Sequence, residues 1–205
     1  MRLRCAIAVG LVALTACGSS SGSATSASCG PSGARTLAVD RVARVYQSRG
    51  DVFGCSTTGT RSFRLGAAAR TIHQGRAGPV ALAGVDVAYG LTEFGVDTVS
   101  AQVIVRNLRS GAQLRREPAT THALGVEFFQ SVAGVVVKPD GAVAWIGHGG
   151  SVIHAGSGET EVNRADARGR ALLDSGNGID AGSLRLHGST VSWRHGAMTR
   201  SATLS

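Results

Sequence analysis

The chain has 205 residues, of which 43% are hydrophobic, 4% aromatic and 17% charged, and it contains 29 glycines. This length suits one domain with appendages, and short apolar segments of Val, Leu and Ala punctuated by glycine favour an all-β fold over helical packing. The formal net charge is +8, but the arginines are spread along the sequence, whereas nucleic-acid-binding proteins concentrate them in a patch or on a helix face. We therefore expect no nucleic-acid partner, and at most a weak attraction to anionic polymers.

Residues 1–16 have the features of a signal peptide. Arg2 and Arg4 give a positively charged start, and Cys5–Leu14 is an apolar run of ten residues, half of the roughly 20 that span a bilayer. Removing this segment lowers the formal charge from +8 to +6, because two arginines leave with it.

The leader ends in Leu14-Thr15-Ala16-Cys17, which resembles the bacterial lipobox. In proteins with that motif, the cysteine thiol receives diacylglycerol and a dedicated peptidase cuts just before it. The resemblance implies lipidation of Cys17 and an anchor on the outer side of the cytoplasmic membrane, in the cell envelope. Cleavage by the general signal peptidase is the alternative, although it would put Leu14 where a small residue is required. Residues 18–28 contain only Gly, Ser, Ala and Thr, so we assign 17–33 to the lipidated cysteine and a flexible tether.

The other two cysteines are expected to pair. Cys5 leaves with the signal peptide and Cys17 carries the lipid, which leaves Cys29 and Cys55 in an exported protein. Such a pair favours a structural disulfide, with two free thiols as the alternative.

An internal repeat organises residues 34–205. Leu82–Tyr89 and Leu186–Trp193 both read L-x-G-x-x-V-x-aromatic, Val137–Trp145 carries one more turn residue, and Leu37–Tyr46 is a degenerate copy. The pattern predicts an apolar strand, a tight turn and a second strand that ends on a large ring. A second hairpin follows three of the four copies, most clearly at Val103–Gly111. Two hairpins in about 50 residues are the content of one four-stranded propeller blade.

Val87–Tyr89 followed by Val103–Gly111 resembles the repeats of TolB-like, WD-repeat-like β-propellers of bacterial envelopes, and the chain is similar to uncharacterised actinobacterial lipoproteins and secreted proteins with such repeats. The resemblance implies an all-β domain at 34–205: a small or incomplete propeller-like array of about four blades. A β-sandwich is the alternative, and the resemblance implies no activity.

No motif predicts catalysis, a metal or a cofactor. His148 and His154 share a glycine-rich segment, but two histidines are too few for a zinc site. Gly147-His148-Gly149-Gly150 has no G-x-S-x-G elbow to accompany it, and the spacing of the acidic residues selects no glycosidase pair.

We therefore expect a noncatalytic binding or interaction module, with an unknown protein or envelope polymer as its partner. The alternative is a structural or sensor subunit of an envelope complex, and a hydrolase is less well supported. Long loops predicted at 91–101 and 147–160 would share one face of the domain. Loops on a rigid scaffold concentrate binding residues. The expected contributors to a ligand-binding face are Glu93, Phe94, Asp97, His148 and His154.

Overall fold

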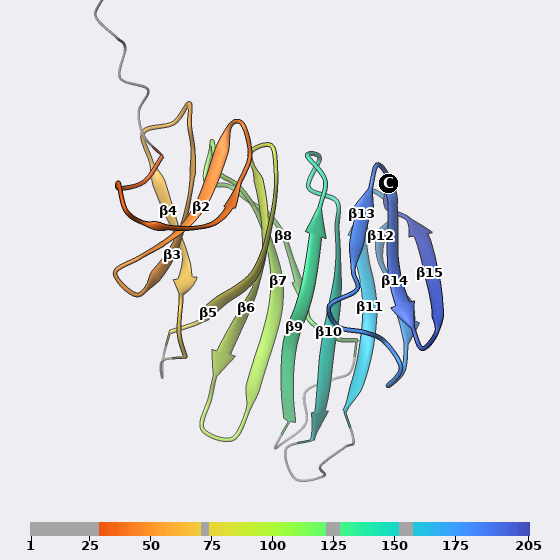
Figure 1. Cartoon of the computed structure of the whole chain (residues 1–205). Coiled ribbons are helices and arrows are strands. Elements are labelled where there is room, and N and C mark those ends of the chain that lie inside the picture. The colour runs from red at the N-terminus through yellow and green to blue at the C-terminus, as the bar shows by residue number, and fades with distance from the viewer. Residues whose placement is uncertain (1–28, 71–73, 122–127, 152–157) are drawn as a thin grey trace, which may run out of the picture.

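The structure is a computed structural model that describes residues 29–70, 74–121, 128–151 and 158–205 (Figure 1). In these ranges the chain forms strands, turns and irregular segments and no helix, so none of the described segments is an apolar helix that could cross a membrane. The prediction of an all-β protein is confirmed.

The first eight strands are β1 (Arg35–Val39), β2 (Ala43–Ser48), β3 (Asp51–Ser56), β4 (Ser62–Ala67), β5 (Arg76–Ala83), β6 (Asp86–Phe94), β7 (Val99–Asn107) and β8 (Gln113–Pro118). The other strands of the described residues are β9 (Phe128–Val137), β10 (Val143–Ser151), β11 (Glu159–Asp166), β12 (Gly169–Ser175), β13 (Arg185–His187), β14 (Thr190–His195) and β15 (Met198–Thr203).

The strands pair as four consecutive antiparallel units. Units 1, 2 and 3 are β1–β4, β5–β8 and β9–β12, and unit 4 is the separate three-stranded sheet β13–β15. Single parallel bridges, Ala67 with Arg76 and Val99 with Phe129, join the first three units into one mixed sheet of 12 strands. The sheet is open and does not close into a barrel.

The sequence repeat corresponds to equivalent hairpins. Gly84 and Gly188 sit in two-residue turns between their strands with φ of 59° and 58°, a left-handed conformation that glycine adopts without steric cost. The large ring that ends each repeat lies on the second strand of its unit, and all four rings are buried: Tyr46, Tyr89, Trp145 and Trp193. The predicted pattern of strand, tight turn and ring-bearing strand is confirmed.

Three hydrophobic clusters fill the three interfaces between successive units. Val45, Val52 and Leu65 of unit 1 pack with Val87 and Tyr89 of unit 2. The second cluster joins units 2 and 3 around Val103, Val105, Val135 and Trp145, and the third joins units 3 and 4 around Ile146, Val162, Val191 and Trp193. The units are therefore stacked in series, each contacting its neighbours, and not arranged as the two facing sheets of a sandwich.

The first strands of the units also follow one another in space: β1 contacts β5, β5 contacts β9, and β9 contacts β13. Hydrogen bonds also link the turn after β1 to the turn after β5, and the turn after β9 to the chain beyond β15. The backbone N–H of Gly84 donates to the carboxylate of Asp40 over 2.7 Å, and Lys138 donates to the carbonyl of Leu204 over 3.2 Å. Each unit thus repeats the placement of the one before it.

The outer end of unit 1 is covered by the chain that precedes β1. At unit 1, a disulfide joins Cys29 to Cys55, which confirms the predicted pair, and the chain at Gly30 lies against the ring of Tyr46. The side chain of Arg44 donates to the carbonyl oxygens of Cys29 and Ala34 over 3.2 and 2.6 Å. Residues 29–33, which precede the expected start of the domain at position 34, are thus attached to unit 1.

The long loops expected at 91–101 and 147–160 are shorter in the structure. β6 continues to Phe94 and β7 begins at Val99, so only residues 95–98 form the turn. β10 continues to Ser151, and β11 begins at Glu159. The ends of β6, β7, β10 and β11 lie within the expected loops and continue to pair with each other.

Candidate functional site

The β6–β7 hairpin carries three of the predicted ligand-binding residues. Glu93 and Phe94 pair with Ser100 and Val99 at the end of the hairpin, and Asp97 is exposed in the turn. The guanidinium carbon of Arg70 lies 4.7 Å from the centre of the Phe94 ring, an arrangement that favours cation–π attraction. Phe94 is therefore half-buried beneath a basic side chain, whereas the two carboxylates face solvent.

His148 lies on β10, half-buried and already in contact with its neighbours. Its Nδ1 is 3.1 Å from the hydroxyl oxygen of Thr160, and its ring centre is 5.4 Å from that of Phe129. Gly158 approaches so closely that an added Cβ would lie 2.6 Å from the imidazole. His148 is thus packed as part of the sheet. His154 lies outside the described residues.

These elements share one end of the stack. β6 and β10 both run toward the lower end in Figure 1, and Val99 bridges Phe129, which pairs with Gly150 at the end of β10. Strands β7 and β9 nevertheless separate the hairpin residues from His148. Among the described residues, the predicted face is therefore one end of the scaffold with separated side chains, and not a convergent cluster.

Sequence reasoning missed a buried carboxylate close to this end. Glu161 on β11 is fully buried and accepts hydrogen bonds from the backbone N–H of Thr121 at 2.8 Å, from its hydroxyl at 2.6 Å and from the Asn163 amide at 2.9 Å. The chain near Thr121 can approach because β10 has a glycine there: a Cβ on Gly147 would lie 1.9 Å from the carbonyl oxygen of Ala119. Glu161 therefore fixes the segment after β8 onto unit 3.

A second buried carboxylate joins units 3 and 4. Asp174 on β12 accepts hydrogen bonds from Trp193 Nε1 at 2.7 Å and Arg200 at 2.5 Å, and it lies 2.9 Å from His195 Nδ1. Burial raises the pKa of Asp174, but the hydrogen bonds from Trp193 and His195 and the charges of His195 and Arg200 outweigh burial, so its pKa lies below the ordinary value. Asp174 is therefore an ionised joint between two units.

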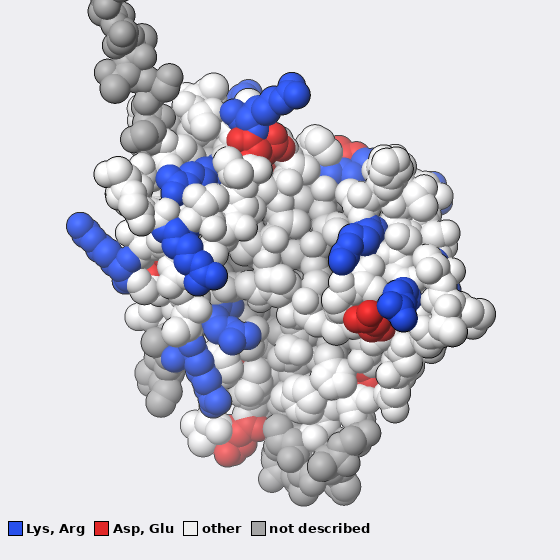
Figure 2. Space-filling model, viewed as in Figure 1, with Lys and Arg blue, Asp and Glu red and all other residues white. Residues whose placement is uncertain are grey.

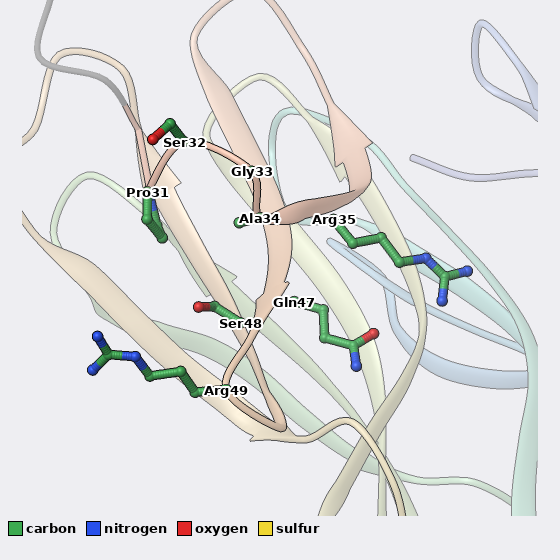
Figure 3. Close-up of a pocket in the computed structure, with 8 residues that line it drawn as sticks. All are labelled: Pro31, Ser32, Gly33, Ala34, Arg35, Gln47, Ser48 and Arg49. Atoms are coloured by element: carbon green, nitrogen blue, oxygen red, sulfur yellow. The ribbon is translucent and has the colours of Figure 1, made fainter.

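A hollow on the described surface lies at the N-terminal end (Figure 3). Its volume is about 490 Å³, and residues 31–35 and 47–49 line it with no acidic side chain among them. Figure 3 shows Arg35 and Arg49 extending away from each other. The hollow is therefore an open, basic surface and not a cage for one small anion.

In the described ranges, no group of three or more His, Cys, Asp or Glu side chains is placed to hold a metal ion. The buried carboxylates Glu161 and Asp174 both serve the joints between segments described above.

No protein-family model matches this chain, and no curated protein matches it. Among solved structures, the chain is similar to the hydrazine synthase of Kuenenia stuttgartiensis, with 15% sequence identity and a TM-score of 0.42. The match covers 74% of this chain and 46% of that one, so the chain spans less than half the length of this neighbour. At this level of similarity we draw no conclusion about fold or activity.

Proposed function

We propose that the protein is a lipid-anchored binding or interaction module outside the cytoplasm, without catalysis of its own. The observation that carries the proposal is the disulfide between Cys29 and Cys55. It fits an oxidising compartment, and it fastens Cys29, the first described residue, to β3 of unit 1. A pull transmitted through the preceding chain would then act on a cross-linked unit.

We also propose that the four units are blades of an incomplete propeller. Three units have four antiparallel strands and the fourth has three. The first strands contact one another in series, as the innermost strands of adjacent blades do. The covered face of unit 1 and the polar outer face of unit 4 explain how such an array can stay open, because a repeat protein needs end units that do not expose an apolar face.

The proposed binding surface is the end of the array that carries Glu93, Phe94, Asp97 and His148, with His154 expected nearby. The support is its position: the β6–β7 turn and the end of β10 project from strands that are paired on both sides. Exposed turns on such a frame can contact a partner without disturbing the core.

Fractionation of cells tests the anchor. Cys17→Ser should move the protein from the membrane fraction to the soluble or secreted fraction, or leave it unprocessed. The matched control is Cys5→Ser, another leader cysteine with no role in the lipobox, which should leave both processing and membrane association unchanged. Normal processing and membrane association of Cys17→Ser would contradict the proposal.

A further inference from the structure

The net charge of the protein is concentrated at one end of the stack. Residues 29–76, which comprise unit 1 and the start of β5, contain eight arginines and two aspartates, a formal charge of +6. Residues 77–205 contain eleven Lys and Arg and eleven Asp and Glu, a formal charge of zero. Because residues 17–28 carry no charged side chain, residues 29–76 account for the whole net charge of the chain from Cys17 onward.

The basic side chains of this unit lie at its surface. Seven of the eight arginines are exposed: Arg35, Arg41, Arg49, Arg61, Arg64, Arg70 and Arg76. The two aspartates are engaged locally: Asp51 pairs with Arg64 over 2.8 Å, and Asp40 accepts from the backbone of Gly84. Figure 2 shows Lys and Arg side chains gathered along the side of the molecule formed by β1–β5, where few acidic side chains are visible. We call these seven arginines the basic end.

Folding creates the basic end from a sequence that has no dense run of charge. Paired strands lie about 4.8 Å apart, so the four strands of one unit span roughly 15 Å. This width is comparable with the Debye length of about 10 Å at 0.1 M salt. A large anionic surface would therefore interact with several of these arginines at once.

The basic end is also the end to which the tether is attached. Cys29 is cross-linked within unit 1, and it follows Cys17 by twelve residues. Twelve residues span at most about 42 Å, about the diameter of a domain of this size, whose radius of gyration is roughly 16 Å. A chain held in a membrane at Cys17 thus keeps unit 1 close to the head groups.

We propose that the basic end docks on a bilayer surface that carries anionic phospholipid head groups. Arginines attract such a surface individually and additively, and a basic patch adds a second membrane signal to an acyl anchor. On the same unit, β1 exposes 38% of Leu37 and 70% of Val39, which can enter the interfacial region. Residues 77–205, which have no net charge, would then extend away from the membrane with the proposed binding surface accessible.

The inference rests on the proposed anchor only in that the anchor determines which membrane the protein contacts. The interaction of the basic end with a bilayer can therefore be tested without the lipid. Residues 17–205 with Cys17→Ser are mixed with vesicles of phosphatidylcholine alone or with equal parts of phosphatidylglycerol, and the bound fraction is measured by sedimentation. We expect binding only to the anionic vesicles, weakening as salt rises from about 0.05 M to about 0.5 M.

Two matched triple variants locate the contact. Arg35→Gln, Arg49→Gln and Arg76→Gln together remove three exposed charges of the basic end, and Arg116→Gln, Arg168→Gln and Arg194→Gln remove three exposed charges elsewhere. Each arginine near an anionic surface contributes about fivefold, so the first triple should lower the partition coefficient about 100-fold. The second should lower it by no more than about threefold, and both should unfold at the same urea midpoint as the parent.

Three results would overturn the inference: no binding of the parent to anionic vesicles at low salt, an equal loss in both triples, or salt-sensitive binding to poly-L-glutamate with none to vesicles. The last would assign the basic end to an anionic polymer. Because no acylated chain is present, failure here would leave lipidation of Cys17 untouched. Normal processing and membrane association of Cys17→Ser would contradict the anchor but would not affect the conclusion from the vesicles.

Discussion

In unit 1, the outward side of the sheet carries the stacked rings of Tyr46 and Phe53, whose centres are 5.6 Å apart, and a cross-linked segment covers Tyr46. In unit 4, the outward side of β14 carries Thr190, Ser192 and Arg194, of which only Ser192 is partly covered. The comparison shows two ways to end a stack of repeats. An aromatic end face needs a covalently fixed cover, whereas a polar end face needs only a firm joint to its neighbour.

Removing the disulfide should have the largest effect. Cys29→Ser frees the covering segment, and loss of a cross-link over 26 residues is expected to cost about 3 kcal/mol of unfolding free energy. Urea unfolding followed by tyrosine and tryptophan fluorescence measures the change. Dithiothreitol should lower the midpoint of the parent to that of the variant, and it should not affect the variant. A parent that is insensitive to the reductant would show that the cover does not depend on the bond.

Asp174→Asn should have the next largest effect, at the other end. The substitution keeps the shape but leaves His195 and Arg200 without a carboxylate partner, and loss of a buried charge partner costs several kcal/mol. We expect about 2 kcal/mol, because the side chain of Arg200 is 41% exposed and solvent screens its share. Asp180→Asn, an exposed acid nearby, is the control and should change stability by less than about 0.5 kcal/mol.

The same joint predicts a pH dependence. The folded-state pKa of Asp174 lies below its ordinary value, so its contribution is complete above about pH 4, near the unfolded-state pKa of about 3.9. The contribution is lost as the pH falls further, through the folded-state pKa. The stability difference between the parent and Asp174→Asn should therefore be present at about pH 5 and shrink as the pH falls through the folded-state pKa. A difference that persists unchanged in acid would mean that the carboxylate charge is not what holds the joint.

The smallest expected effect tests the equivalence of the repeats. Gly84→Ala and Gly188→Ala each place a Cβ at φ near +60° without a close steric contact, so each should cost about 1 kcal/mol. Asn tolerates this conformation better, and Gly188→Asn should recover part of the loss. Thermal unfolding of the three variants gives the comparison, and a markedly larger cost at one glycine would show that the two turns differ in more than position.

Much of the fold could be predicted from the sequence because the repeat combines two local rules. The tight turn requires a residue in the left-handed conformation, and glycine supplies it. The ring at the end of the second strand provides the large buried side chain of each unit, as at Tyr89 and Trp193. The disulfide was readable by counting cysteines, since Cys29 and Cys55 remained after two others had been assigned. These inferences needed no knowledge of which strands are neighbours.

The missed features depend on distant neighbours. Glu161 is buried against Thr121, forty residues away, and nothing near either residue in sequence marks the contact. The end of β6 at Glu93 and Phe94 lies within an expected loop. It is a strand because it pairs with β7, and the sequence of β6 alone does not show that pairing. The arginines of residues 29–76 are likewise separated in sequence, and the pairing of β1–β4 brings most of them onto one unit.

The most direct test of the account is the intact mass of the protein purified from the membranes of its own cells, measured before and after reduction. The account predicts a chain that begins at Cys17, carries a diacylglyceryl group there, and contains one reducible bond, between Cys29 and Cys55. A chain that begins at any other residue, an unmodified Cys17, or two free thiols at positions 29 and 55 would contradict it.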